Sequence, residues 1–215
     1  KQEARKTHYV KSLSYVAQKY NLNVTEEFLL SLVEGSLSTI SPSEMVLANY
    51  YRAIKYVEGD YINPINHQFL VNSYALLTGV NVTELPYRKE TNEDEISCEA
   101  IIPSMDGLFN FCINDDISPL IKAIASYFYI IYIKPFDVYS EEIAILFAKN
   151  VLGHNDFEAV ISLIDMESLL IQNEEELNGI ISTVVKTSDL TYLINYVIRI
   201  YDNIITNYLD SMTIM

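Results

Sequence analysis

The stretch that decides the fold runs from Ser118 to Gly153 and reads SPLIKAIASYFYIIYIKPFDVYSEEIAILFAKNVLG. It predicts two helices joined by a short loop. Ser118 followed by Pro119 favours a helix start, because proline lacks only an N–H that the first helical turn leaves unused. From there to Ile133 almost every residue is apolar, which indicates a helix surrounded by others. Pro135 disfavours helical geometry at the residue before it, so the first helix ends there.

The second predicted helix follows directly after this loop. Asp137 or Ser140 is its predicted N-cap, and Gly153 lies just past its end. Glu141 and Glu142 fall in its first turn, where the helix dipole favours negative charge. A loop that opens onto a helix N-terminus is a place where proteins bind phosphates, so this loop is the first candidate site.

Caps and apolar residues at helical spacing predict further helices on both sides. Thr25 is a predicted N-cap, Gly35 a stop, and Ser41 with Glu44 a capping box. Ser188 is the predicted cap of the last helix. The predicted ranges are 1–20, 25–34, 41–58, 63–79 and 105–112 before the central stretch, and 156 onward, 165–179 and 188–209 after it.

One section departs from this helical pattern. A polar run over residues 89–95 precedes Ile96, Cys98, Ala100 and Ile102, which alternate with more polar residues. Alternation of this kind predicts a short β-hairpin. The predicted fold is therefore mainly all-α, with about eight helices and one small hairpin.

The chain shows no internal repeat and no linker long enough to separate domains. We therefore predict a single domain over residues 1–215, with N-terminal helices in 1–40, a core in 41–155 and C-terminal helices in 156–215. Half of the 215 residues are apolar, which is ample for a core.

Charge and hydropathy exclude several classes of partner. The formal net charge is −15, so nucleic acid and anionic membrane surfaces are not expected to bind. The longest apolar run, from Ala123 to Ile133, is about half of the ~20 residues that a membrane-spanning helix needs. No signal peptide is visible in a chain that opens at Lys1, so we expect a cytoplasmic protein, or one exported by a route not visible in this segment.

The cysteines and histidines predict neither disulfides nor a metal site. Cys98 and Cys112 form no dense pattern, which fits a reducing compartment. His8, His67 and His154 fall on predicted polar faces or loops and form no cluster. We predict them to be surface residues.

The central stretch and the order of the elements resemble the Fic (Fido) family, most members of which transfer AMP from ATP to a protein hydroxyl. That family's pattern is an apolar helix that runs into His-Pro-Phe-x-(Asp/Glu)-Gly-Asn-Gly-Arg-x-x-Arg. Pro86-Tyr87-Arg88 resembles the residues before the family's substrate-docking flap, and Ile101, Ile102 and Pro103 resemble the end of that flap. The resemblance extends over roughly residues 29–204 and implies a Fic-like helical bundle.

Most of the signature has been replaced. Lys134 stands where the family has its catalytic histidine, while Pro135 and Phe136 match. Asp137 takes the variable position, and Val138 replaces the acidic residue that holds the metal. The other departures are Tyr139, Ser140 and Glu141 in place of Gly-Asn-Gly, and Glu142 and Ile145 in place of the two arginines.

These changes act together against nucleotide chemistry. In the family, the histidine takes a proton from the target hydroxyl, the glycines admit the phosphates and arginine neutralises their charge. A protonated lysine at position 134 is a poor general base, although it attracts phosphate as a point charge or reaches solvent. Glu141 and Glu142 place negative charge where a polyphosphate would lie, and they satisfy the helix dipole without a ligand.

A second family motif is partly present near the N-terminus. Ser31, Glu34 and Gly35 match the inhibitory motif Ser-Ser-x-Ile-Glu-Gly of some Fic proteins, whose glutamate reaches the second arginine of the signature. That arginine is missing here, so Glu34 is expected to serve at the helix end rather than in regulation.

The resemblance and its departures leave two functions open. The favoured one is a catalytically degenerate Fic-like domain that binds a partner protein, or regulates an active relative, through the former substrate groove and flap, with no cofactor and no metal. The alternative is a Fic-type transferase with altered chemistry that moves AMP or another phosphate-containing group. It would use ATP with magnesium, Lys134 as an anion contact and Asp137 as a metal ligand or base. A homo-oligomer is left open.

Overall fold

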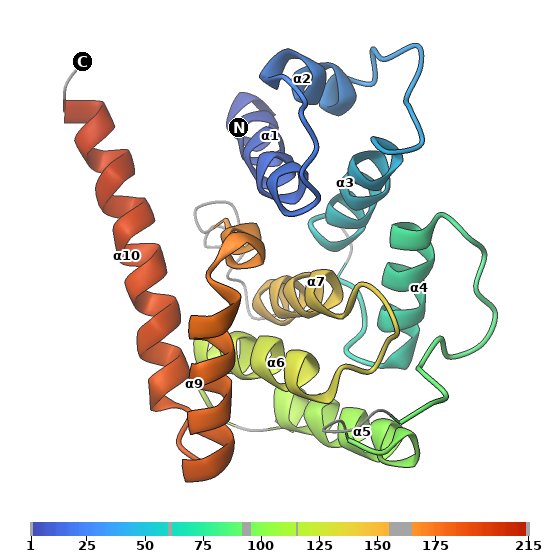
Figure 1. The fold of residues 1–215 in the computed structure, drawn as a ribbon, viewed down its shortest axis with the longest axis vertical. Helices are drawn as coiled ribbons and strands as arrows, with labels where there is room; N and C mark the ends of the chain where they lie inside the picture. Colours follow the sequence, from blue (N-terminus) through green and yellow to red (C-terminus); the bar gives the residue numbers. More distant parts are fainter. Residues whose placement is uncertain (1, 60–61, 92–95, 115, 155–164, 214–215) are drawn as a thin grey trace. The chain divides into compact units, whose positions relative to one another are not determined.

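The computed structural model describes residues 2–59, 62–91, 96–114, 116–154 and 165–213. These residues are helical or irregular and contain no strand, so the mainly α-helical fold is confirmed (Figure 1). The chain forms two compact units, residues 1–171 and 172–215. The helices of the first unit are α1 (Gln2–Lys19), α2 (Glu26–Glu34), α3 (Met45–Val57), α4 (His67–Thr78), α5 (Cys98–Asn114), α6 (Pro119–Ile133), α7 (Ser140–Gly153) and the 3₁₀ helix η1 (Met166–Ile171).

The two central helices form as predicted. Pro119 occupies the first turn of α6, and Lys134 ends this helix in the left-handed conformation, at φ 46°. Helix α7 is the more deeply buried of the two, because its residues 142–152 are all buried. Neither predicted cap holds, since the N-cap of α7 is Tyr139, without a capping side-chain hydrogen bond.

The N-terminal caps are largely confirmed. The Thr25 side chain accepts from the backbone N–H of Phe28, and Gly35 ends α2 at φ 71°, a conformation that favours glycine. Ser41 and Glu44 exchange the two hydrogen bonds of a capping box, of 2.9 and 3.3 Å, but these bonds close a turn that precedes the helix. Helix α3 begins at Met45, later than predicted, with Glu44 as its N-cap and without a side-chain cap. Helix α4 begins three residues later than its nearest predicted start signal, because Asn66, whose side chain accepts from two backbone N–H groups, is its cap.

The predicted β-hairpin is wrong. Residues 98–103 form the first part of α5, and residues 92–95 lie outside the described residues. Ile101, Met105 and Leu108 are buried at helical spacing, and this longer apolar stripe prevails over the short alternation that predicted strands. The predicted flap residues Ile101, Ile102 and Pro103 therefore lie on a helix, with Ile102 exposed.

The second compact unit consists of α9 (Glu174–Thr187) and α10 (Thr191–Thr213). The predicted helix break at Gly179 does not occur, since Gly179 lies inside α9. Ser188 is not the cap of the last helix, because it ends α9 in the left-handed conformation, at φ 55°. Asp189 instead accepts a 2.9 Å hydrogen bond from the backbone N–H of Thr191. The helix predicted from residue 156 lies outside the described residues.

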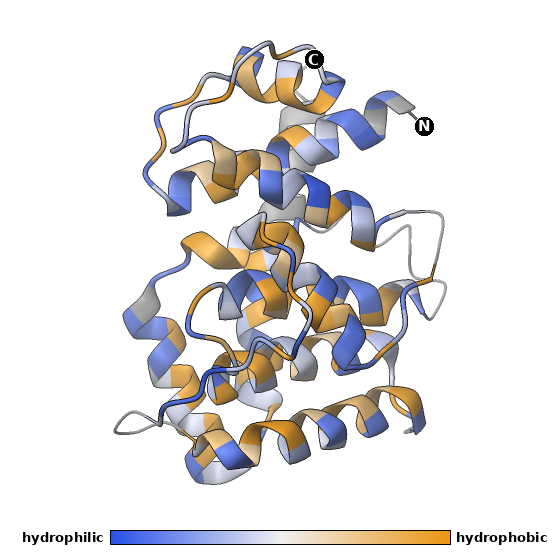
Figure 2. Cartoon of the chain, turned by 90° about the vertical axis from the view of Figure 1, so that its right-hand side faces the viewer, coloured by the Kyte–Doolittle hydropathy of each residue, from blue (hydrophilic) through white to orange (hydrophobic). Residues whose placement is uncertain are grey.

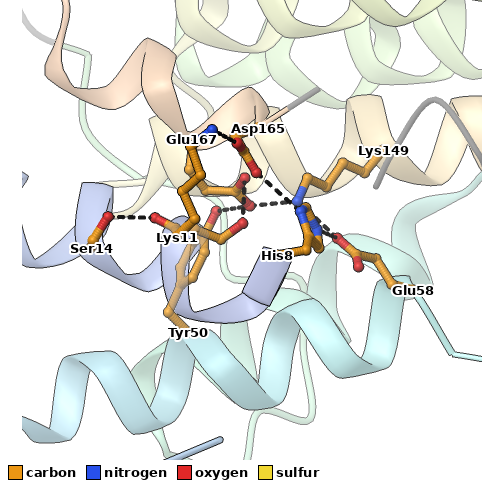
Figure 3. A network of polar contacts seen from close by, with 9 residues as sticks. His8, Lys11, Ser14, Tyr50, Glu58, Lys149, Asp165 and Glu167 are labelled. Atoms are coloured by element: carbon orange, nitrogen blue, oxygen red, sulfur yellow. Dashed lines mark hydrogen bonds and ion pairs between the residues drawn. The ribbon is translucent and has the colours of Figure 1, made fainter. Parts of the chain in front are cut away.

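Buried charged side chains fasten α1 to the rest of the first unit (Figure 3). Lys149 of α7 is fully buried, and its ammonium lies 2.6 Å from Glu167 and 2.8 Å from Glu58. His8 of α1 lies 3.0 Å from Asp165 and 3.1 Å from Glu58. The prediction of a surface position is therefore wrong for His8, which is 5% exposed. We call the set of Lys149, Glu167, Glu58, His8, Asp165 and Lys11 the ionic cluster; Lys11 contacts Asp165 at 2.7 Å.

The distribution of apolar residues along the helices agrees with their packing. Apolar and polar residues alternate in patches along the helices, as expected of helices that bury one face (Figure 2). In the part of the chain that the structure describes, no helix combines the length and the apolar character that crossing a bilayer requires.

Candidate functional site

The loop between α6 and α7 lines a pocket of about 530 Å³. Its walls come from the end of α1, from the segment before α5, from α6 and from the start of α7. The lining residues are Lys19, Tyr20, Arg88, Ile131, Lys134, Phe136, Asp137, Val138, Tyr139, Ser140, Glu141 and Glu142. The loop that the sequence indicates as the first candidate site therefore lines this pocket.

Two left-handed residues shape the loop. Lys134 has φ 46° and Tyr139 has φ 66°, conformations that cost a residue with a side chain more than they cost glycine. Ser140, directly after Tyr139, closes the loop: its hydroxyl donates to the carbonyl of Phe136 at 3.1 Å and accepts from the Phe136 N–H at 3.3 Å. The Phe136 ring stacks on Tyr74, with ring centres 5.3 Å apart, and this buries the loop's apolar side.

Arg88 ties the loop to the segment before α5. Its Nε donates to the carbonyl of Lys134 at 2.8 Å, and its backbone N–H donates to the carbonyl of Pro135 at 3.0 Å. The same guanidinium donates to the carbonyls of Glu90 and Ile96. Arg88 therefore supplies the hydrogen bonds that strand pairing would supply to these carbonyls in a hairpin. The backbone of this segment is satisfied without forming strands.

The end of α1 reaches the start of α7. The Lys19 ammonium lies 2.6 Å from Glu141 Oε2 and 2.8 Å from Glu142 Oε1. The Tyr20 hydroxyl donates to the same Glu142 oxygen at 2.6 Å. Glu142 is only 2% exposed, while the Glu141 side chain is 52% exposed. The positive end of the α7 dipole therefore faces carboxylates of this chain.

The pKa shifts agree with this arrangement. Burial alone would lower the pKa of Lys19, but the charges and hydrogen bonds of Glu142 and Glu141 outweigh it and raise that pKa. Burial, with the Glu142 charge next, raises the pKa of the Tyr20 phenol. At neutral pH, Lys19 is thus an ammonium and Tyr20 is a hydrogen-bond donor.

The remaining predicted site residues divide into two groups. Lys134, Asp137 and Val138 are exposed and line the pocket. Ile145, the last of the predicted phosphate-loop positions, is fully buried in α7 and does not line the pocket. Among the described residues, no group of three metal-ligating side chains lies close enough to hold an ion.

The inhibitory-motif residues are not at the pocket. Ser31 and Glu34 lie on α2, Gly35 ends this helix, and none of the three lines the pocket. The Glu34 carboxylate pairs with Lys6 of α1 instead. Glu34 thus lies at the end of α2, as predicted, and its carboxylate contacts α1 rather than the pocket.

Sequence reasoning missed the contribution of α1. Lys19 and Tyr20 end the predicted helix over residues 1–20, where Tyr20 belongs to the apolar stripe, and they lie 122 residues from Glu141 and Glu142 respectively. The available signal was the pair Glu141 and Glu142 itself, since a buried carboxylate requires a charged or hydrogen-bonding partner. That signal does not say which part of the chain supplies the partner.

Comparison with solved structures identifies the fold. A crystal structure of a Fic family protein from Desulfovibrio desulfuricans G20 superposes with a TM-score of 0.77 and 14% sequence identity. The match covers 97% of this chain and 66% of that one, so the chain spans just under two thirds of that protein. A scan against models of known protein families finds no match, and neither does a search of curated proteins. The structural match shows a Fic-like helical fold.

Proposed function

From this Fic-like fold, we propose that the chain is a catalytically degenerate Fic-like domain that binds a partner protein, or regulates an active relative, without transferring AMP. One observation carries the proposal. The first turn of α7, where the signature of active Fic proteins cradles phosphates, holds Glu141 and Glu142, and both carboxylates are bound by Lys19. The positive end of the α7 dipole is thus already neutralised by groups of this chain, although the pocket beside it is open.

Electrostatics opposes a polyphosphate in this pocket. Two unit negative charges about 5 Å apart repel by roughly 3 kcal/mol at an effective dielectric constant near 20. Lys19 offsets part of this repulsion, but a phosphate that attracts Lys19 would leave Glu142 buried without its ion pair. The side chain of Tyr139 adds bulk where the family has glycine.

A second candidate function rests on the size of the pocket. It is large enough for part of a nucleotide, and it exposes both Lys134 and Asp137. These residues support the alternative of a transferase with altered chemistry, in which Lys134 contacts an anion. ATP with magnesium would then be its cofactor.

Calorimetric titration with ATP and magnesium separates the two candidates. We expect no saturable heat up to millimolar nucleotide, and no label transfer from radiolabelled ATP to added proteins. A signature-bearing Fic enzyme is the positive control for the assay. Saturable binding at micromolar ATP would refute the degenerate-domain proposal and favour the transferase.

Restoring the family's histidine alone is expected to give no activity. In Lys134→His, a general base returns, but Tyr139, Glu141 and Glu142 still occupy the phosphate positions. The substitution is expected to be tolerated, because position 134 is exposed and histidine is among the residues that adopt the left-handed conformation. Label transfer by this variant, measured beside the unaltered chain, should stay at background; transfer well above background would contradict the proposal.

A further inference from the structure

The pocket contains a charged ligand that belongs to the chain itself. The Lys19 ammonium contacts two carboxylates, those of Glu141 at 2.6 Å and Glu142 at 2.8 Å. These distances are those of short charge-assisted hydrogen bonds. The arrangement of an ammonium bound to Glu141 and Glu142 beside an open pocket is therefore a cation-binding site with its ligand in place.

We propose that Lys19 is an internal, displaceable ligand of this pocket, which accepts a lysine or arginine side chain of a partner protein in its place. This inference rests on the proposed protein-binding function and names the chemistry of the partner. Exchange of one cation for another leaves the pocket's charge unchanged. The buried carboxylate of Glu142 keeps a partner throughout, which avoids the cost of an unpaired buried charge.

The position of Lys19 suits an exchangeable ligand. It is the last residue of α1, and its side chain is 21% exposed, so the ammonium can leave without moving the buried residues of that helix. Glu141 is half exposed and presents a carboxylate to an approaching cation. Partly exposed ion pairs contribute little free energy, so releasing Lys19 from Glu141 to solvent costs little.

The walls of the pocket fit the stem of a long basic side chain. In the lining, Val138 is exposed, Tyr139 is half-buried and Phe136 is buried. Lysine and arginine place their methylene stems on apolar surface, and aromatic faces attract their charged ends. The exposed carboxylate of Asp137 adds a further acceptor.

The chain as a whole also favours a basic partner. Its formal charge of −15 attracts positively charged proteins over distances longer than a hydrogen bond. Phosphate-bearing and acidic partners would be repelled by the same field and by the carboxylates at α7. The commitment is thus to a basic side chain presented by a protein.

Chemical rescue tests the proposal. Lys19→Ala removes the internal ammonium and opens the site, and n-butylammonium chloride supplies the lost group. We expect butylammonium to bind this variant at least tenfold more tightly than the unaltered chain, and to raise its melting temperature above that in sodium chloride of equal ionic strength. If Lys19→Ala fails to fold, Lys19→Gln keeps most of the stem and is titrated instead.

Two variants of the same design serve as controls. Lys6 lies on α1, as Lys19 does, but it pairs with Glu34 of α2 and does not line the pocket. The Lys6→Ala variant should therefore gain no butylammonium binding. Lys19→Ala/Glu142→Gln removes the buried acceptor and should lose the rescue. Equal butylammonium affinity in the Lys19 and Lys6 variants, or in the unaltered chain, would overturn the proposal.

A basic peptide extends the test to the unaltered protein. A peptide with one central lysine should bind and shift the resonances of pocket residues, and its acetyl-lysine form should bind at least tenfold more weakly. Equal affinity of the two peptides would contradict the inference. If the peptides do not discriminate and ATP does not bind either, the Lys19 proposal fails and the proposed function stands. Saturable ATP binding would refute the proposed function, on which the Lys19 proposal rests.

Discussion

Replacing Lys149 by methionine should destabilise the first unit more than any other single change proposed here. Lys149 is fully buried, and its ammonium is the shared partner of Glu58 and Glu167. Methionine fills similar space but leaves two carboxylates in the interior with less compensation. Removing one partner of a buried ion pair costs about 3–5 kcal/mol of unfolding free energy, measurable by urea denaturation.

The pKa directions of Lys149 and Glu58 favour their charged forms in the folded state. Burial would lower the pKa of Lys149, but Glu167 and Glu58 outweigh burial and raise it. Burial would raise the pKa of Glu58, but Lys149 and His8 outweigh burial and lower it. Lys149 and Glu58 therefore depend on their neighbours for their charge, and the loss of either one changes the ionisation of the other.

A double variant separates the lost ion pair from lost packing. In Lys149→Met/Glu167→Gln, the carboxylate that loses its partner is also neutralised, so part of the stability should return. We expect a coupling free energy of about 2 kcal/mol in the double-mutant cycle. The exposed Lys186 of α9 provides the control, because Lys186→Met should change stability by no more than about 0.5 kcal/mol. A loss below about 1 kcal/mol for Lys149→Met would contradict the prediction.

The parts of the fold that were predictable are those fixed by neighbouring residues. Pro119, Pro135 and the apolar run between them set the limits of α6, because proline acts on its own turn. The capping box at Ser41 and Glu44 is another local device. The hairpin prediction was wrong because four alternating residues were weighed without the helical stripe that continues to Cys112.

The ionic cluster and the α1 contacts were beyond sequence reasoning. His8 was assigned to a polar face because the apolar spacing of α1 marks only one side of that helix. In the structure, Ser12 and Leu13 are both fully buried, so α1 is covered over a wider arc than its apolar stripe. Which acidic residues meet His8 is set by packing between segments 50 and 157 residues away, and no local pattern encodes it.

The loop and its departures from the family pattern were predictable, but the occupant of the site was not. The sequence placed Glu141 and Glu142 at the start of α7, and the structure agrees. It gave no indication that Lys19 and Tyr20 would bind them. This difference underlies the proposal of a basic partner, because a lone acidic pair would only repel phosphate, whereas this pair binds an ammonium.

Stability should fall steadily as the pH rises from about 6.5 to about 9, because of His8. Its Nδ1 faces an oxygen of Asp165 at 3.0 Å and its Nε2 faces one of Glu58 at 3.1 Å. Only the doubly protonated imidazolium donates to both carboxylates. Burial alone would lower the pKa of His8, but these two hydrogen bonds raise it from 6.5 to about 9.

The sign of the effect follows from proton linkage. Below pH 6.5, His8 is protonated in both the folded and the unfolded chain, and its full contribution to stability is present. Between about pH 6.5 and 9, the unfolded chain has lost the proton that the folded chain keeps, so each unit of pH removes up to about 1.4 kcal/mol. The total loss is about 3 kcal/mol. At the acid end, the lowered pKa values of Glu58 and Asp165 remove stability as the pH falls below about 4.

Urea denaturation at intervals between pH 5 and 9 measures this profile, and one substitution assigns it. His8→Gln cannot carry the charge, so it should be less stable at pH 6 and its profile should be nearly flat from pH 6.5 to 9. His67→Gln is the matched control, because His67 lies outside the ionic cluster, between Tyr87 and Asp106, and should leave the alkaline slope intact. An unaltered chain with constant stability over this range, or a His8→Gln variant with the full slope, would show that His8 enters the cluster uncharged. The cluster would then carry an excess of negative charge, and the attachment of α1, on which the position of Lys19 depends, would need another explanation.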